Sequence, residues 1–418
     1  MDNARPRAIL RPMDHDVIIA GGGLNGSTMA LALAGAGLDV ALVDPAPVAI
    51  RAAPGFDGRS YALSVGSRNL LRALGLWDTL APDAQPILEI KVSDGRAGEG
   101  PSPFVLEFDH AEIEEGPMGH MVEDRHLRPA LLNALEAAPR VTAIAGRRVT
   151  AQDAGPAGIE VTLDDGTALT ARLLVGCDGR GSQTGRRAGI RRTGWEYGQN
   201  ALVAAIAHEK PHRGVAHQFF MPEGPLAILP LRENRASIVW TERTARAAAL
   251  TALPEAAYLD ILRPRFGDFL GDISLAGARY TYPLALSLAN RFAAPRVALA
   301  GDAAHAVHPI AGQGLNAGLK DVASLAEVVA DAQRRGEDIG RIDVLERYDR
   351  WRRFDATALA MATDGFNRLF SNDNPLLRAG RDLGLGLVNR LPRLRRSFVR
   401  EAAGLTGDRP RLLRGLPL

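Results

Sequence analysis

The chain has 418 residues, and its 50 basic and 48 acidic side chains leave a formal net charge of only +2. Nucleic-acid binding would require a marked basic excess, so we expect no nucleic-acid partner. Cys177 is the only cysteine, which excludes intramolecular disulfides, a redox-active cysteine pair and thiolate metal clusters. We therefore expect no metal site and a cytoplasmic protein, and the length allows two joined domains.

The N-terminal part of the chain predicts a dinucleotide-binding unit. After a tail of residues 1–13, residues 16–20 form an apolar run typical of a buried parallel strand, and residues 40–43 form a second run that ends at Asp44. Between them a G-x-G-x-x-G pattern opens a helix; its glycines are Gly21, Gly23 and Gly26. In such a turn the glycines permit a tight bend, close approach of a pyrophosphate, and close packing of helix on strand. An acid at the position of Asp44 suits a ribose hydroxyl.

Two further strands, predicted at residues 173–176 and 296–300, are each followed by an acid beside a glycine. These pairs are Asp178 with Gly179, and Gly301 with Asp302. A second glycine-rich turn and a helix to about residue 332 follow; the marked residues there are Pro309, Gly312, Gly314, Leu315 and Asn316. An acid at the end of a strand beside such a turn is placed to bind a sugar-like chain. The N-terminus of the helix favours negative charge.

In order and spacing the three motifs resemble those of the group A flavoprotein monooxygenases, the para-hydroxybenzoate hydroxylase type. A narrower resemblance, from Asp14 to about Gly404, is to the FAD-dependent hydroxylases of ubiquinone biosynthesis. The segments that carry it are residues 57–64, 123–127, 223–231 and 237–240. The resemblance implies an α/β fold with a Rossmann-like FAD-binding domain of the glutathione-reductase type, an inserted, mainly β substrate domain, and a C-terminal helical region.

The same resemblance implies an enzyme that uses FAD, electrons from NADH or NADPH, and O2 to hydroxylate an aromatic ring. Its narrower form implies a polyprenylated phenol as substrate and a ubiquinone-biosynthesis complex as partner. By this resemblance Arg59 and Arg125 contact the FAD, and the Asp178-Gly179 pair serves both the FAD and the nicotinamide donor. Asp302 would bind ribityl or ribose hydroxyls, and Pro309 would lie beside the flavin ring.

The catalytic base stays open at this point. Deprotonation of a phenol would make its ring a stronger nucleophile, and His217, Tyr197 and His308 are candidates for the base. For each of them an ordinary structural role explains the residue at least as well. Two other activities also stay open, namely an FAD-dependent polyprenyl reductase and a flavin-binding scaffold without catalysis.

The predicted domain division is discontinuous. The FAD-binding domain comprises residues 14–85, 113–195 and 280–330, the substrate domain comprises 86–112 and 196–279, and the C-terminal helical region comprises 331–418. The end of that region mixes leucines with arginines, namely Arg378, Arg381, Arg390, Arg393, Arg395, Arg396 and Arg400. A basic amphipathic helix either lies on an anionic membrane or packs on the core with its basic face in solvent. A polyprenylated substrate would favour the first, at the inner face of the membrane.

Overall fold

The computed structural model describes residues 13–48, 57–96, 98, 100–308, 312–370, 391, 396–397, 399–401 and 403–418. The predicted tail, except for Met13, and Pro309 lie outside the described residues. So does most of the basic C-terminal segment, of which Arg396 and Arg400 are described. None of the helices in the described part of the chain is long and apolar enough to cross a membrane.

A mainly parallel sheet carries the first glycine-rich turn. Its order is β18–β19–β11–β1–β2–β8, and all neighbours are parallel except the pair of β18 and β19. The antiparallel strands β9 and β10 extend it beside β11. The bounds are β1 His15–Ala20, β2 Val40–Asp44, β8 Val141–Ala145, β9 Val149–Ala154, β10 Ile159–Leu163, β11 Ala168–Gly176, β18 Ala293–Ala294 and β19 Val297–Leu299. The inner strands are buried because helices cover the sheet, which confirms the predicted α/β fold.

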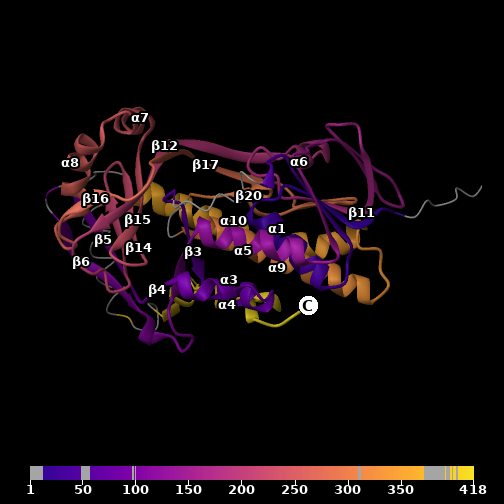
Figure 1. The fold of residues 1–418 in the computed structure, drawn as a ribbon, viewed down its shortest axis with the longest axis horizontal. Coiled ribbons are helices and arrows are strands. Elements are labelled where there is room, and N and C mark those ends of the chain that lie inside the picture. Colours follow the sequence, from indigo (N-terminus) through magenta and orange to yellow (C-terminus); the bar gives the residue numbers. More distant parts are fainter. Residues whose placement is uncertain are drawn as a thin grey trace, which may run out of the picture.

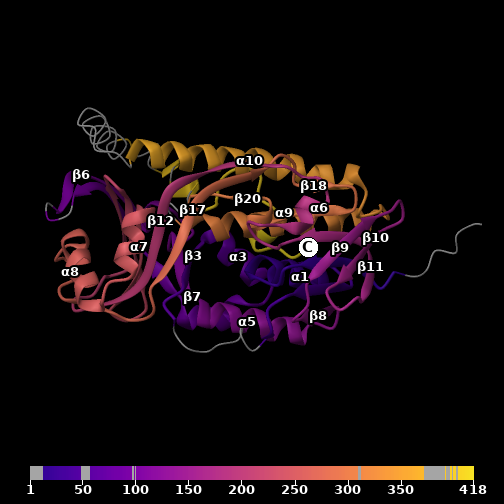
Figure 2. The ribbon, with the colours of Figure 1, turned by 90° about the horizontal axis from the view of Figure 1, so that it is seen from above.

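A nine-stranded sheet forms the other large layer. Its order is β20–β17–β12–β15–β14–β13–β5–β6, with β16 beside β12. The bounds are β5 Glu89–Arg96, β6 Gly100–Asp109, β12 Arg192–His208, β13 Val215–Met221, β14 Gly224–Leu231, β15 Arg235–Arg243, β16 Ile273–Leu275, β17 Tyr280–Ala289 and β20 His305–Ala306. The long strands β12 and β17 run side by side between the two halves of the molecule (Figure 1 and Figure 2). The predicted boundary after residue 195 therefore falls within the continuous strand β12, whereas the boundary at residue 280 coincides with the start of β17. The division into domains stays a proposal.

Helices and a small sheet complete the described fold. The small sheet has the order β3–β7–β4, and helix α9 packs against both α1 and α10. The bounds are β3 Ser60–Ser64, β4 Gln85–Ile87, β7 Gly119–Glu123, α1 Leu24–Gly35, α3 Val65–Ala73, α4 Trp77–Leu80, α5 Asp124–Ala137, α6 Gln183–Arg187, α7 Thr244–Thr251, α8 Glu255–Phe266, α9 Gln313–Arg334 and α10 Ile342–Phe370. Short 3-10 helices are η1 Ala81–Asp83, η2 His110–Glu112, η3 Gly301–Ala303 and η5 Leu412–Arg414.

Different elements pack against the two faces of the nine-stranded sheet. On one face, Ala205 and Ala216 share a core with Val65 of α3 and Met121 of β7, so we call it the inner face. On the other, outer face, residues of β12 to β15 share a core with helices α7 and α8; they include Leu202, Ala204, Ile206, Phe219, Met221, Leu226 and Trp240. Because side chains alternate along a strand, consecutive residues of one strand belong to opposite faces, whereas residues paired across neighbouring strands share a face.

Candidate functional site

The turn between β1 and α1 is shaped by its glycines. Gly21 has φ +103°, and a Cβ there would collide with the carbonyl oxygen of Cys177. A Cβ at Gly26 would collide with the carbonyl oxygen of Gly21. At Gly23, by contrast, a Cβ would meet no described atom within 4 Å. The turn therefore needs Gly21 and Gly26 for its own packing, while Gly23 leaves open space above a helix N-terminus, where a pyrophosphate fits.

Asp44 closes the edge of this turn from the end of β2. Its Oδ2 accepts a hydrogen bond from the backbone N–H of Gly22 at 2.5 Å, and its Oδ1 accepts one from Ala46 at 2.8 Å. The carboxylate is thus fixed beside the phosphate-binding turn. This is the place from which a ribose would be bound, and that contact stays a prediction.

Asp178 has a local structural role in the described residues. Its Oδ1 accepts a hydrogen bond from the Ser182 hydroxyl at 2.5 Å, and its Oδ2 accepts one from the backbone N–H of Thr184 at 3.0 Å. These bonds order the start of α6. Gly179, at φ +78°, turns the chain there and faces open space. The pair lies beside the first turn, since a Cβ on Gly21 would also reach Asp178 Cα at 3.0 Å.

A buried charge cluster supports the turn that carries Gly301 and Asp302. The carboxylate of Asp321, on α9, accepts hydrogen bonds from the Gly301 N–H at 2.9 Å, from His305 Nε2 at 2.6 Å and from Arg352 Nε at 2.8 Å. Asp321 is 0% exposed and Arg352 is 2% exposed. Burial alone would raise the pKa of Asp321, but the charges of His305 and Arg352 outweigh it and hold that pKa below its ordinary value. The turn is thereby fixed from the side of α9.

A second arginine holds the same turn from the side of the nine-stranded sheet. Arg192 of β12 donates to the carbonyl oxygens of Asp302, at 3.1 Å, and of Ala303. The Asp302 carboxylate itself is 44% exposed, and among the described residues it makes one long ion pair, with the exposed Arg180 at 3.4 Å. The backbone of the turn is therefore held by its neighbours, while the carboxylate stays accessible to a ligand.

Asn316 joins the start of α9 to β3 and α3. Its Nδ2 donates to the carbonyl oxygens of Ala62, at 2.8 Å, and Gly312, at 3.1 Å. Its Oδ1 accepts from the Ser64 N–H at 2.9 Å and the Ser67 hydroxyl at 2.7 Å. Asn316 is predicted to bind cofactor; the structure shows that it positions the helix N-terminus.

The same turn has two further glycines and Leu315. Gly312, at φ +64°, is the N-cap of α9, and a Cβ on Gly314 would meet no described atom within 4 Å. Leu315 packs against the main hydrophobic core. Gly314 therefore leaves the N-terminus of α9 open to a ligand, as Gly23 does for α1.

The two predicted FAD-contacting arginines are each held by neighbouring carboxylates. Arg59 pairs with Asp57 at 2.6 Å and with Asp124 at 3.3 Å, and the hydrogen bond to Asp57 raises its pKa. Arg125 pairs with Glu123 at 2.6 Å. Both side chains stay partly exposed, so these carboxylates orient them without covering them. Their contact with FAD stays a prediction.

The three candidate bases lie in two separate places. Tyr197 and His308 lie together, with ring centroids 5.3 Å apart. His217 lies on β13 beside Phe219 and Phe269, on the outer face, away from α3 and β7. The structure thus argues against His217 as the base, because the strand turns its side chain away from the elements that carry the cofactor motifs.

Neither remaining candidate is a strong base at neutral pH. Burial lowers the pKa of His308 to about 4. Burial, together with the nearby Asp364, raises the pKa of the Tyr197 hydroxyl, which makes its ionisation harder. A general base works best when its pKa is near the operating pH, so neither residue is tuned for that task.

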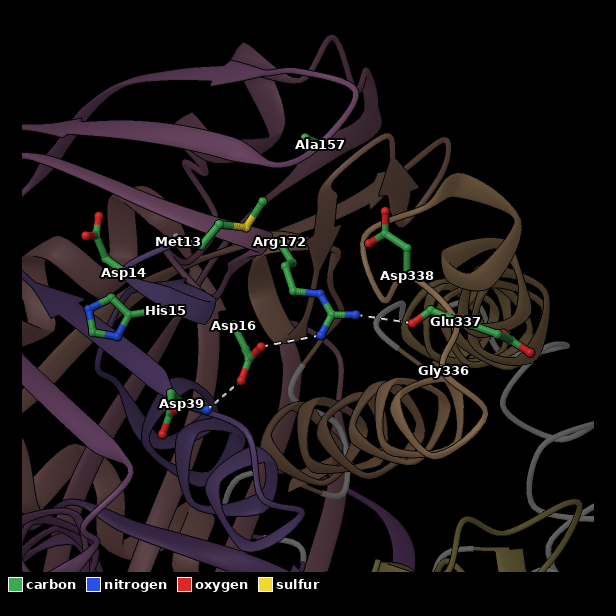
Figure 3. Close-up of a pocket in the computed structure, with 10 residues that line it drawn as sticks. All are labelled: Met13, Asp14, His15, Asp16, Asp39, Ala157, Arg172, Gly336, Glu337 and Asp338. Carbon is green, nitrogen blue, oxygen red and sulfur yellow. Dashed lines mark hydrogen bonds and ion pairs between the residues drawn. The ribbon is translucent and has the colours of Figure 1, made fainter. Parts of the chain in front are cut away.

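Two cavities lie outside this arrangement. The first, of about 470 Å³, is at the start of β1, where Arg172 bridges Asp16 at 3.4 Å and the carbonyl of Glu337 at 3.2 Å (Figure 3). Five acidic residues line it, namely Asp14, Asp16, Asp39, Glu337 and Asp338, and this excess of negative charge disfavours a pyrophosphate. The second, of about 570 Å³, lies on the outer face beside His217 and Phe269. Dinucleotides bind at the carboxyl ends of parallel strands, so the first cavity is at the wrong edge of the sheet.

Three elements distant in sequence therefore form one site, with glycines that leave room for a phosphate, an accessible carboxylate and two helix N-termini. This arrangement, on a mainly parallel sheet joined to a second, β-rich layer, fits the class of flavin-dependent monooxygenases. Comparison with known proteins agrees. Residues 14–363 match the family model described as "FAD binding domain".

The relatives identify the family. The ubiquinone hydroxylase UbiL of Rhodospirillum rubrum is 46% identical over 96% of this chain and 93% of its own. The 3-demethoxyubiquinol 3-hydroxylase of Escherichia coli is 35% identical over 93% of this chain and 98% of its own. The chain belongs to the family of FAD-dependent ubiquinone-biosynthesis hydroxylases. In fold it is similar to p-nitrophenol 4-monooxygenase PnpA from Pseudomonas putida DLL-E4, with a TM-score of 0.78 at 21% identity over 96% of this chain and 100% of that one.

Several residues that build the site carry no motif of their own. Asp321, Arg352 and Arg192 all support the Asp302 turn, yet they lie 19 to 110 positions from it in the sequence. Asn25 lies between the turn and α9, because a Cβ on either Gly301 or Gly318 would collide with its amide. The only signal that sequence offered for this contact was the glycine at position 318 inside a helix-forming stretch.

Proposed function

We propose that this FAD-dependent monooxygenase hydroxylates the ring of a polyprenylated phenol in ubiquinone biosynthesis, with O2 and electrons from NADH or NADPH. The observation that supports it is a row of side chains across the inner face of the nine-stranded sheet. Paired positions on six neighbouring strands are occupied by Val203, Val239, Ala227, Gln218, Val92 and Leu106. We call these six residues the inner-face row.

The inner-face row suits an apolar aromatic ring with a hydrocarbon tail. Five of its six members are apolar, and Val203, Ala227 and Val239 are partly exposed although they lie on central strands. The row itself contains no cation that would pair with a substrate carboxylate. At one end of the row, Leu106 and Val92 form an apolar cluster with Phe220 and Phe108, which extends the wall. Such a wall excludes water from the reacting atoms.

The other roles follow from the geometry of the three turns. Gly23 leaves the α1 N-terminus open for the pyrophosphate, Asp44 would bind a ribose, and Asp302 would bind the ribityl chain. The N-terminus of α9 would favour negative charge at the flavin end of the cofactor. FAD, when bound, supplies the electron transfer and O2 activation, and the chain supplies position, desolvation and fixed dipoles.

Contact with a membrane surface and a biosynthetic complex is part of this proposal. The basic C-terminal segment would bring a polyprenyl substrate from the lipid phase to the inner-face row. The end of that segment lies beside the inner face, because Val399, Ala403 and Leu405 pack into the same core as Ala205 and Ala216. Co-sedimentation of the full chain with anionic and with neutral vesicles tests this. Equal binding to both vesicle types would exclude electrostatic membrane contact.

The purified FAD-loaded protein tests the reaction itself. It is given NADH or NADPH, O2 and 2-farnesylphenol, and the product is analysed by mass. The proposal expects phenol-stimulated oxidation of the nicotinamide and a product heavier by one oxygen atom. A polyprenyl reductase would add hydrogen to the tail without consuming O2, and a scaffold would leave the phenol unchanged. Either outcome would contradict the proposal.

A further inference from the structure

Gln218 is the one polar member of the inner-face row. It lies on β13 between Ala227 of β14 and Val92 of β5 and is only 9% exposed. Its Nε2 is buried and has no hydrogen-bond partner among the residues that the structure describes. This is unusual, because nearly all buried polar groups in folded proteins are paired.

A second buried glutamine on the same sheet gives the comparison. Gln199 of β12 is 8% exposed, and both ends of its amide are used. Its Nε2 donates to the Glu223 carbonyl at 2.9 Å, and its Oε1 accepts from Asn367 Nδ2 at 3.1 Å. Gln199 therefore has a structural role that accounts for its burial. Gln218 has no such role within the described residues.

The surroundings of Gln218 specify the kind of partner that it would take. Its neighbours along the row are apolar, and the Leu106–Phe220 cluster lies beside them. A flat apolar ring could lie against this wall with one polar atom directed at the amide. An amide carries both a donor and an acceptor without net charge, so it suits a phenol oxygen, which both donates and accepts. A carboxylate would call instead for a cation.

We propose that the Gln218 amide forms a hydrogen bond with the ring oxygen of the phenol and so sets which ring carbon faces the flavin. This inference rests on the proposed function and assigns a positioning residue to it. A ring fixed through its oxygen presents one carbon to the reaction, so the residue determines regioselectivity as well as affinity.

The test compares two probes that differ only in the ring oxygen, 2-farnesylphenol and farnesylbenzene. Their dissociation constants are measured on the FAD-loaded enzyme, through the change that binding causes in the visible flavin spectrum. Wild-type protein is expected to bind the phenol at least about ten-fold more tightly, which corresponds to about 1.4 kcal/mol. In Gln218→Leu this preference should fall to about one, and the hydroxylated product should become a mixture of positional isomers.

Gln199→Leu is the matched control, since it removes an equally buried amide from the same sheet. It should lower the melting temperature and keep the preference for the phenol. If Gln218→Leu does not retain FAD, Gln218→Met, which keeps the length of the side chain, replaces it. An unchanged preference and a single product in a folded, FAD-loaded Gln218 variant would overturn the inference while wild-type activity stands. A wild-type enzyme that neither binds nor hydroxylates the phenol would overturn the proposed function and this inference together.

Discussion

Asp321 and His305 form a fully buried pair, with 2.6 Å between Oδ2 and Nε2, beneath the turn that carries Asp302. The same Oδ2 accepts the N–H of Gly301, and Oδ1 accepts from Arg352. A carboxylate on α9 thus fixes both the start and the end of the Gly301–His305 motif. The accessible Asp302 carboxylate is held in place by residues that do not themselves reach a ligand.

Removing the charge of Asp321 should destabilise the whole site. In Asp321→Asn the buried Arg352 loses one of its two carboxylates and keeps only Asp355, at 3.0 Å. We expect the free energy of unfolding to fall by about 3 kcal/mol, as for other broken buried pairs, and FAD to be lost more readily. Urea unfolding followed by circular dichroism measures the change.

The matched control for this variant is Asp343→Asn. Asp343 pairs with Arg341 at 2.9 Å, and both side chains are more than half exposed. Such surface pairs contribute little, so the control should stay within about 0.5 kcal/mol of wild type. Equal effects of the two substitutions would show that the Asp321 cluster does not support the turn.

Substitution of a glycine in the first turn should weaken FAD binding without affecting folding. Gly23→Ala adds a methyl group to open space, so the protein should fold with its normal melting temperature yet bind FAD at least about ten-fold more weakly. Gly35→Ala, near the end of the same helix and also open, should leave FAD affinity unchanged and raise stability by up to about 1 kcal/mol. Titration of the apoprotein with FAD compares them. Wild-type affinity in Gly23→Ala would rule out a pyrophosphate at this turn.

Asp302→Ala should weaken FAD binding and leave the free energy of unfolding nearly unchanged. The carboxylate is partly exposed, and its ion pair with Arg180 is long and at the surface, so unfolding should change by less than about 0.5 kcal/mol. The ribityl or ribose hydroxyls, however, would lose their acceptor. The measurement is the ratio of flavin to protein absorbance after gel filtration. A variant that stays fully yellow would count against the role assigned to Asp302.

The pH dependence of stability should carry a contribution from His308. The ordinary pKa of a histidine is near 6.5, and burial lowers that of His308 to about 4 in the folded protein. Between these values the unfolded chain binds a proton that the folded chain does not. The contribution of the neutral His308 to the free energy of unfolding is therefore complete above pH 6.5. It is lost as the pH falls towards 4, by up to about 1.4 kcal/mol per pH unit.

His308→Leu removes the proton uptake of His308 on unfolding. The free energy of unfolding of this variant should therefore fall less steeply between pH 6.5 and 4.5 than that of wild type. Loss of the contact with Tyr197 would displace the whole curve without changing its slope. Urea unfolding at several pH values gives both slopes. Parallel curves would show that His308 is already protonated, or is accessible to solvent, in the folded protein.

The sequence predicted the cofactor-binding half of the site well because its motifs are local. Strand, glycine turn and helix follow one another within some thirty residues, and steric rules alone explain Gly21 and Gly26. Helix α9 also begins where the glycines at 312 and 314 indicate. No spacing rule, however, connects Asp321 with Arg352 or Arg192 with Asp302. These contacts arise only when α9, α10 and β12 come together.

The substrate side was predictable only in part, for a different reason. The strands of the nine-stranded sheet are apolar on both faces, so alternation shows that His217 and Gln218 point opposite ways but not which one faces the flavin. That answer depends on the helices α7 and α8, which cover the outer face. His217 stood out in the sequence as a titratable group, whereas the unpaired amide of Gln218 becomes visible only in the folded chain.

The most direct test of the account follows the oxygen atom. The FAD-loaded protein is incubated with NADH or NADPH and 2-farnesylphenol, once under ¹⁸O₂ in ordinary water and once under ordinary O2 in H₂¹⁸O. The account predicts a hydroxylated phenol that carries one ¹⁸O atom from the gas and none from the water. A product without label from O2, or no ring oxidation while FAD is fully bound, would contradict the assignment of this chain as a phenol-hydroxylating monooxygenase.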